Sequence, residues 1–117
     1  MSSIQDLTKL IIKFRDARNW KKFHQPKDLA ISLMLEAGEV AEHFQWKSEK
    51  EIVDFLKKNN QELGDELADV LYWVLLISHD TGIDLTEALL RKMKKNEEKY
   101  PVKLAFGKYT KYTRLKR

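Results

Sequence analysis

The chain of 117 residues contains no cysteine. Disulfide bonds and thiolate chemistry are therefore excluded, and the composition fits a reducing compartment. The longest apolar run, Val70 to Ile77, is far shorter than the roughly 20 residues that a membrane-spanning helix needs. The N-terminus, Met1 to Asp6, lacks the basic and then apolar segments of a signal peptide. We therefore expect a soluble, cytoplasmic protein.

Glycine and proline are also scarce, with four and two residues, and no stretch alternates apolar and polar residues over a useful length. Both observations disfavour strands and tight turns and favour helices. With 43% hydrophobic residues, the chain is long enough for one domain and too short for two of ordinary size. The sequence predicts an all-α fold in a single domain over residues 1–117.

Capping signals divide this fold into five helices. Ser3, Ser48 and Asp84 each precede an acidic residue by three positions, which is the pattern of a capping box. Gly82 is suited to end one helix, and proline at position 101 prevents another from continuing. The predicted helices span Ser3 to about Arg18, Pro26 to about Phe44, Ser48 to about Lys57, about Gln61 to His79, and Asp84 to about Lys99.

Charge is unevenly distributed along the chain. From Lys99 onward there are seven basic residues and no acidic one, whereas residues 1–98 carry 15 basic and 18 acidic residues. The body is thus mildly acidic, and a basic tail begins at about residue 100. Such a tail is compatible with nonspecific nucleic-acid binding, with a solvated terminus, or with a segment that contacts a polyanionic ligand.

Two pairs of acidic residues lie among apolar positions. Glu36 and Glu39 are three residues apart in the second predicted helix, and Glu66 and Asp69 have the same spacing in the fourth. Residues three apart share a helix face, and in both helices that face borders the apolar stripe. If the two helices pack antiparallel, the carboxylates converge, and a cation is then needed to offset the cost of burying them. Carboxylate oxygens favour Mg²⁺ or Mn²⁺ over zinc.

The acids have two other possible interpretations. They could lie on solvated faces and pair with lysines, as most helical acids do, but apolar residues flank both pairs. They could also form a di-iron bundle, but that architecture uses Glu-x-x-His motifs, and His43 follows Glu39 at four residues rather than three. Iron is therefore disfavoured.

The acidic pairs and their spacing resemble the signature of the MazG-like all-α nucleoside triphosphate pyrophosphohydrolases: Glu36-x-x-Glu39, 26 intervening residues, then Glu66-x-x-Asp69. Further matches resemble the dCTP pyrophosphatase branch, and they extend over nearly the whole chain. They are Trp20-Lys-Lys-Phe-His-Gln-Pro, Phe44-Gln-Trp-Lys-Ser, Lys92-x-x-x-Asn96, Tyr100-Pro-Val and Lys111-Tyr-Thr. The resemblance implies a four-to-five-helix bundle completed by oligomerisation, as a homotetramer (a dimer of dimers) or a homodimer.

The same resemblance implies Mg²⁺-dependent cleavage of a (d)NTP to the monophosphate and pyrophosphate, a nucleotide-pool house-cleaning reaction. The substrate would be dCTP or a modified dCTP. Mg²⁺, with Mn²⁺ as a substitute, would be held by Glu36, Glu39, Glu66 and Asp69. Glu39 and Glu36 are the candidate catalytic carboxylates, because a metal-bound water needs a group that orients or deprotonates it.

By resemblance, three residues would bind the base: Trp20, His24 and Trp46. Four would reach the phosphates: Lys92, Asn96, Tyr100 and Lys111. The ordinary alternatives are packing for the tryptophans and a solvated lysine-rich face for Lys92. One position departs from the branch, because Trp73 stands where tyrosine is usual, with Tyr72 just before it. Discrimination between deoxyribose and ribose is the property that this change puts in question.

Two competing functions follow from the same residues. One is a noncatalytic nucleotide- or nucleic-acid-binding helical module that uses the basic tail. The other is a hydrolase of a different nucleotide, such as dUTP or a purine triphosphate. The intact set of four acids favours an enzyme, and we expect neither a specific nucleic acid nor a membrane among its partners.

Overall fold

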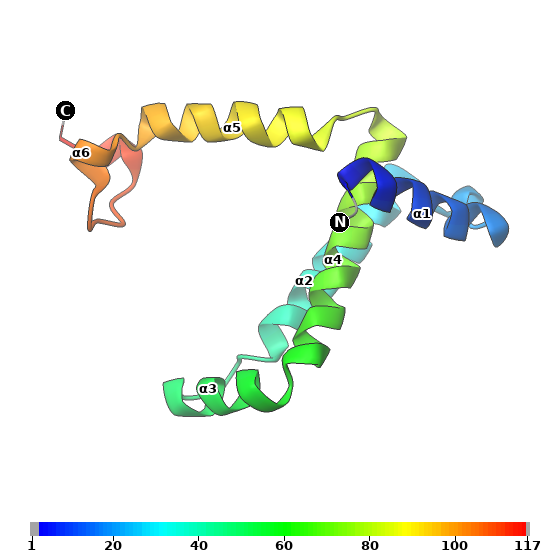
Figure 1. Cartoon of the computed structure of the whole chain (residues 1–117), viewed down its shortest axis with the longest axis horizontal. Coiled ribbons are helices and arrows are strands. Elements are labelled where there is room, and N and C mark those ends of the chain that lie inside the picture. The colour runs from blue at the N-terminus through cyan, green and yellow to red at the C-terminus, as the bar shows by residue number, and fades with distance from the viewer. Residues whose placement is uncertain (1–2, 117) are drawn as a thin grey trace. The chain divides into compact units, whose positions relative to one another are not determined.

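The computed structural model describes residues 3–116, and over that range it contains only helices and connections (Figure 1). In chain order the described helices are α1 (Ile4–Ala17), the 3-10 helix η1 (Lys21–Phe23), α2 (Pro26–Glu42), α3 (Glu49–Lys58), α4 (Asn60–Thr81), α5 (Leu85–Lys99), α6 (Val102–Ala105) and the 3-10 helix η2 (Tyr112–Arg114). The predicted all-α fold is confirmed. Within residues 3–116, no helix combines the length and the apolar character that crossing a bilayer requires.

The chain divides into two compact units, residues 1–82 and 83–117. The single domain over residues 1–117 stays a prediction.

Local signals set the helix boundaries as expected. Capping boxes at Ser3 and Ser48 open α1 and α3, with the serine side chains accepting hydrogen bonds from the backbone N–H of Asp6 and Glu51. At Asp84, one bond of the predicted box is present, from Glu87 N to Asp84 Oδ1 at 3.1 Å. Gly82 ends α4 in the left-handed conformation with φ of 72°, which glycine adopts without steric cost.

In the first unit, α2 packs along α4, and α1 and α3 contact α4 near its two ends (Figure 1). α3 connects α2 to α4, and α2 and α4 run antiparallel (Figure 1). The predicted convergence of the two acidic pairs depends on this arrangement. This arrangement brings the C-terminal half of α2 beside the N-terminal half of α4. The two acidic pairs lie on those halves.

The core of this unit is thin. Three hydrophobic residues are fully buried in the described chain: Leu29 from α2, and Leu75 and Leu76 from α4. Large apolar side chains elsewhere on the same two helices stay substantially exposed, namely Ile31, Met34, Leu35, Leu67 and Leu71. A soluble monomer rarely leaves so much apolar helix surface uncovered. The predicted completion of the bundle by oligomerisation offers a cover for these faces and stays a prediction.

In the second unit, α5 is followed by a sixth helix that the sequence did not predict. Proline at 101 ends helical continuation as expected, yet it also serves as the N-cap of α6, where its missing N–H costs nothing. The basic tail then turns at Gly107, with φ of 72°. Tyr112 packs edge-on against Tyr100, with ring centroids 5.9 Å apart, and lies under the Lys99 ammonium group at 4.7 Å. Part of the tail is thus packed against the end of α5.

Candidate functional site

Three of the four predicted metal ligands come together between α2 and α4. One carboxylate oxygen from each of Glu36, Glu39 and Glu66 lies within 4.8 Å of the other two. Glu36 and Glu39 face the same side of α2 because they are three residues apart. The antiparallel α4 presents Glu66 to that side. Glu36 and Glu66 are half-buried, whereas Glu39 is exposed. These three residues are called the acid cluster below.

The fourth predicted ligand, Asp69, lies one turn beyond Glu66 on α4. It lines an open pocket together with Glu36, and its negative charge contributes to raising the pKa of both Glu36 and Glu66. Asp69 is therefore close enough to interact with the acid cluster, although its oxygen is not within the 4.8 Å group. Its exposed side chain stands on the pocket side.

Lost hydration and neighbouring like charges disfavour the ionised form of the acid cluster. Loss of hydration is the largest cause of the raised pKa of Glu36, followed by a hydrogen bond with the carboxyl group of Glu39. For Glu66, the hydrogen bond with Glu39 is the largest cause of the raised pKa, and burial comes second. A hydrogen bond between two carboxyl groups needs a shared proton. Among the residues that the structure describes, the buried Oε2 atoms of Glu36 and Glu66 have no hydrogen-bond partner.

These observations fit a hard divalent cation. Buried oxygens without donors, held close together with like charges, are the arrangement that Mg²⁺ or Mn²⁺ stabilises by coordination. Glu36, Glu39 and Glu66 would hold the ion, with Asp69 one turn away. His43 is the nearest nitrogen ligand candidate, but its Nε2 lies 3.7 Å from Glu66 Oε1 and it is not one of the grouped donors.

The open pocket beside the acid cluster has a volume of about 560 Å³ and mostly aromatic and aliphatic walls. Its lining residues are Leu10, Ile11 and Phe14 from α1, Trp20 from the following connection, Glu36 from α2, and Asp69, Tyr72 and Trp73 from α4. Phe14 holds both neighbours edge-on, with ring centroids 5.6 Å from Trp20 and 6.4 Å from Tyr72. An apolar pocket lined also by the carboxylates of Glu36 and Asp69 can bind a flat, partly apolar ligand that carries a metal-bound group.

The structure treats the three predicted base-binding residues differently. Trp20 lines the pocket. His24 is not among the lining residues. Its ring lies edge-on to that of Trp73, with centroids 5.6 Å apart, and desolvation by burial is the main cause that lowers its pKa. Trp46 follows the other end of α2, is 91% exposed, and has a left-handed backbone with φ of 68°. The 17 residues of α2, about 25 Å of helix, separate the positions of Trp20 and Trp46 along the chain.

The four predicted phosphate-binding residues all belong to the second unit. Lys92 and Lys111 are exposed, and Asn96 is half-buried near the end of α5. The backbone N–H of Tyr100 donates to Asn96 O at 2.8 Å, and its ring packs on Tyr112. The alternative of a solvated face for Lys92 agrees with its exposure.

A buried ion pair was missed by sequence reasoning. Arg15 on α1 is 1% exposed, and its two terminal nitrogens each donate to a different carboxylate oxygen of Asp80 on α4, both at 2.8 Å. The hydrogen bond from Arg15 is the largest cause that lowers the pKa of Asp80. A local signal existed, because Arg15 follows Ile11 by four positions on the apolar stripe of α1. The partner, 65 residues away, could not be read from it.

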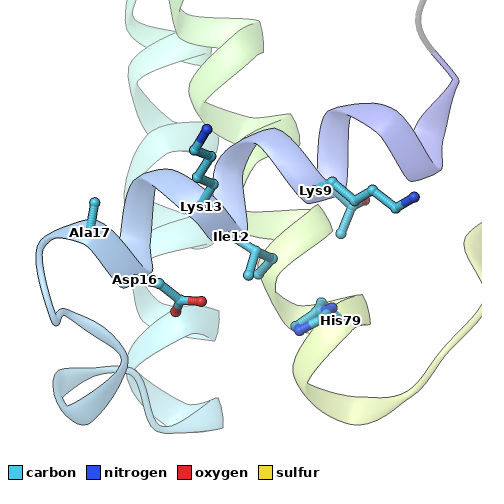
Figure 2. A pocket seen from close by; sticks show the side chains of 7 residues that line it. Lys9, Ile12, Lys13, Asp16, Ala17 and His79 are labelled. Atoms are coloured by element: carbon cyan, nitrogen blue, oxygen red, sulfur yellow. The ribbon is translucent and has the colours of Figure 1, made fainter.

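A second pocket, of about 600 Å³, opens on the other side of α1 (Figure 2). α1 contributes all but one of its lining residues, and α4 contributes His79: Thr8, Lys9, Ile12, Lys13, Asp16, Ala17 and His79. It contains none of the predicted site residues. Although slightly larger, it lacks the converging acids, so we place the functional site at the acid cluster and the adjoining pocket.

Comparisons with known proteins identify the family of this chain. The MazG-like family matches residues 31–115, which contain both acidic pairs. The chain is 38% identical to dCTP pyrophosphatase 1 of Mus musculus over 117 residues, covering 98% of this chain and 69% of that protein. It is 36% identical to dCTP pyrophosphatase 1 of Homo sapiens over 115 residues, covering 97% and 68%. The predicted resemblance to the dCTP pyrophosphatase branch is confirmed by these matches.

A solved structure supports the fold as well. The crystal structure of a pyrophosphatase from Archaeoglobus fulgidus superimposes with a TM-score of 0.80 at 40% sequence identity, covering 86% of this chain and 94% of that one. The helical order, the acid cluster between antiparallel helices and these matches lead to one conclusion. The chain belongs to the MazG-like family.

Proposed function

We propose that this chain is a Mg²⁺-dependent nucleoside triphosphate pyrophosphohydrolase that acts on dCTP or a modified dCTP. The observation that carries the proposal is the place of Glu36, which belongs both to the acid cluster and to the wall of the aromatic pocket. A nucleotide needs both features side by side, since its base is flat and its phosphates bind metal. We further propose that it works in nucleotide-pool house-cleaning in the cytoplasm.

The four carboxylates would have different roles. Glu36, Glu39, Glu66 and Asp69 would hold the metal ion, which would neutralise phosphate charge and lower the pKa of a bound water. Glu39 is the exposed member of the acid cluster. It is therefore placed to accept a proton from a water approaching from solvent, with Glu36 as the second candidate. Attack at the α-phosphorus would release pyrophosphate and leave the monophosphate.

The pocket would receive the base. Trp20, held edge-on by Phe14, offers an indole face for stacking, which contributes roughly 1–3 kcal/mol per base in other aromatic sites. His24, whose ring lies edge-on to Trp73, would contact the polar edge of the base. Support for cytosine comes from the relatives, which are named dCTP pyrophosphatase 1. Lys92, Asn96, Tyr100 and Lys111 are proposed as further contacts of the phosphates.

Assembly is part of the proposal. Exposed apolar residues on α2 and α4, among them Met34 and Leu67, would be covered by a second copy in a homodimer or a homotetramer built as a dimer of dimers. Trp46 projects from the end of α2 opposite to Trp20, so it would complete a base pocket by contributing to a neighbouring copy. Sedimentation or light scattering of the full chain tests this, and a monomer at micromolar concentration would contradict it.

The decisive experiment is a substrate panel with Mg²⁺: dCTP, modified dCTP, CTP, dUTP and purine triphosphates. We expect dCTP or a modified form to be cleaved fastest, with pyrophosphate as the product. Orthophosphate as the product, or no turnover of any nucleotide, would overturn the mechanism. Comparing dCTP with CTP also measures the discrimination between deoxyribose and ribose.

One observation favours the noncatalytic alternative enough to test it. In the tail, Phe106 and Tyr109 are almost fully exposed and lie between Lys103, Lys108 and Lys111. Basic residues interleaved with aromatic ones can bind single-stranded nucleic acid. The double variant Lys103→Glu, Lys108→Glu discriminates the functions. Loss of salt-sensitive RNA or DNA binding by a protein without nucleotide turnover would favour the binding module.

A further inference from the structure

His43 is the side chain beside the acid cluster that the proposed mechanism does not use. Its Nε2 lies 3.7 Å from Glu66 Oε1, with 20% of the His43 side chain and 24% of the Glu66 side chain exposed. This separation is too long for a hydrogen bond, so the imidazole lies against Oε1 without donating to it. His43 follows Glu39 by four residues at the end of α2, so both side chains face α4.

The opposite side of the imidazole is fixed by α3. The ring lies against Phe55, with centroids 5.1 Å apart and planes inclined by 32°. Phe44 packs edge-on to the same phenyl ring at 5.9 Å, and the Lys47 ammonium group lies 4.9 Å from its centroid. Lys47 Nζ also donates to the backbone carbonyl of His43. The imidazole therefore lies between Phe55 on α3 and the carboxylate of Glu66 on α4.

The two oxygens of Glu66 consequently have different surroundings. Oε1 faces the imidazole, whereas Oε2 is buried without a hydrogen-bond partner. A carboxylate with one oxygen against an imidazole ring and the other left open is oriented for binding a cation through the open oxygen. In metal sites, groups that orient a ligand in this way contribute roughly 10- to 100-fold to metal affinity.

We propose that His43 is a positioning residue for Glu66: it holds Oε1 so that Oε2 is presented to a divalent cation in the acid cluster. The inference rests on the proposed metal-dependent function and deepens it. It also gives α3 a role, because Phe55 supports the imidazole that orients Glu66.

Three substitutions separate positioning from packing. His43→Phe keeps an aromatic ring against Phe55 but removes the nitrogen, His43→Gln restores a nitrogen donor without the ring, and His43→Ala removes both. His79→Phe on α4 is the matched control, because His79 is exposed and lines the second pocket, away from the acid cluster. Mg²⁺ binding is measured by titration calorimetry on the full chain, and kcat is measured at saturating Mg²⁺.

We expect His43→Phe and His43→Ala to weaken Mg²⁺ binding by roughly 10- to 100-fold. His43→Gln should recover most of the loss, and His79→Phe should bind as the unmodified protein does. Because His43 does not touch the reacting atoms, kcat at saturating Mg²⁺ should change by less than about threefold in every variant. A rise in the Mg²⁺ requirement without a matching fall in kcat is a result that a purely structural role would not produce.

Unchanged Mg²⁺ affinity in His43→Phe would overturn the inference and assign the imidazole to packing on Phe55. A fall in kcat with unchanged affinity would overturn it too. If the unmodified protein itself binds no Mg²⁺, the proposed function fails together with this inference. If it binds Mg²⁺ and cleaves dCTP while all His43 variants match it, this inference fails alone.

Discussion

α4 carries charge into the protein interior at two places, and the chain treats them in opposite ways. Near its C-terminal end, Asp80 is paired with Arg15, and both carboxylate oxygens accept hydrogen bonds. Nearer its N-terminal end, Glu66 lies close to Glu36 and Glu39. The buried Oε2 atoms of Glu36 and Glu66 have no hydrogen-bond donor among the described residues. We call the first site complete because its two charges balance within the chain, although the buried Nε of Arg15 has no hydrogen-bond partner among residues 3–116. This site is structural. The second is incomplete without a cation, which is the property expected of a site that binds one.

The largest expected effect comes from removing a charge at the incomplete site. Glu36→Gln keeps the size of the side chain but weakens both metal binding and the wall of the pocket. We expect turnover of dCTP to fall by roughly 1,000-fold or more, equivalent to about 4 kcal/mol of transition-state stabilisation, with helicity unchanged. Asp65→Asn, an exposed acid beside Glu66, should retain activity. Full turnover by Glu36→Gln would show that the acid cluster is not the site.

Breaking the complete site should instead reduce stability. Asp80→Ala leaves the guanidinium of Arg15 buried and unpaired, so we expect a loss of about 3–5 kcal/mol in the free energy of unfolding. Denaturation with urea, monitored by circular dichroism, measures it. Asp16→Ala removes an exposed acid next to Arg15 and should change the free energy by less than about 0.5 kcal/mol. Equal effects of the two changes would mean that the ion pair contributes little beyond a surface contact.

Adding Mg²⁺ should distinguish the two sites. A ligand at 100 times its Kd stabilises a protein by about 2.7 kcal/mol, and the acid cluster is where we expect Mg²⁺ to bind. The melting temperature of the unmodified protein and of Asp80→Ala should therefore rise with Mg²⁺, whereas that of Glu36→Gln should rise little. A rise of the same size in Glu36→Gln would locate the bound ion elsewhere.

The smallest effect is a pH dependence of opposite sign at the two sites. The pKa of Asp80 is lowered from 3.8, so its pairing stabilises the protein above that pH, and the stabilisation is lost as pH falls through the folded-state pKa. The pKa values of Glu36 and Glu66 are raised from 4.5, so the folded state binds protons more tightly there. Without metal, stability at the acid cluster therefore decreases as pH rises from about 4.5 through the folded-state pKa.

Urea denaturation in EDTA over a pH series measures this difference. The gain in stability of Glu66→Gln over the unmodified protein should grow as pH rises above 4.5, because the amide removes the charge that the cluster disfavours. The loss in Asp80→Asn should instead be largest at neutral pH and shrink below 3.8. A gain in Glu66→Gln that is independent of pH would show that charge repulsion is not its cause.

The contrast also shows what can be predicted from one sequence. The acid cluster was predictable, since two pairs at a spacing of three define a face on each helix, and antiparallel packing then brings the pairs together. Arg15–Asp80 was not, because a long-range pair depends on the angle at which α1 crosses α4. Trp46 shows a similar limit. Its neighbours in sequence suggest a base pocket, yet its exposure of 91% became visible only in the structure.

The sequence by itself determined the five long helices and their approximate ends. Ser3, Ser48 and Gly82 act through hydrogen bonds and backbone angles within a few residues, so their effects do not depend on the rest of the chain. Only the tertiary structure decided which charges meet. Glu66 lies against two carboxylates and Asp80 against a guanidinium because α2 and α1 pack on different parts of the same helix. That packing comes from the burial of Leu29, Leu75 and Leu76, which carries no information about charge until the helices are in place.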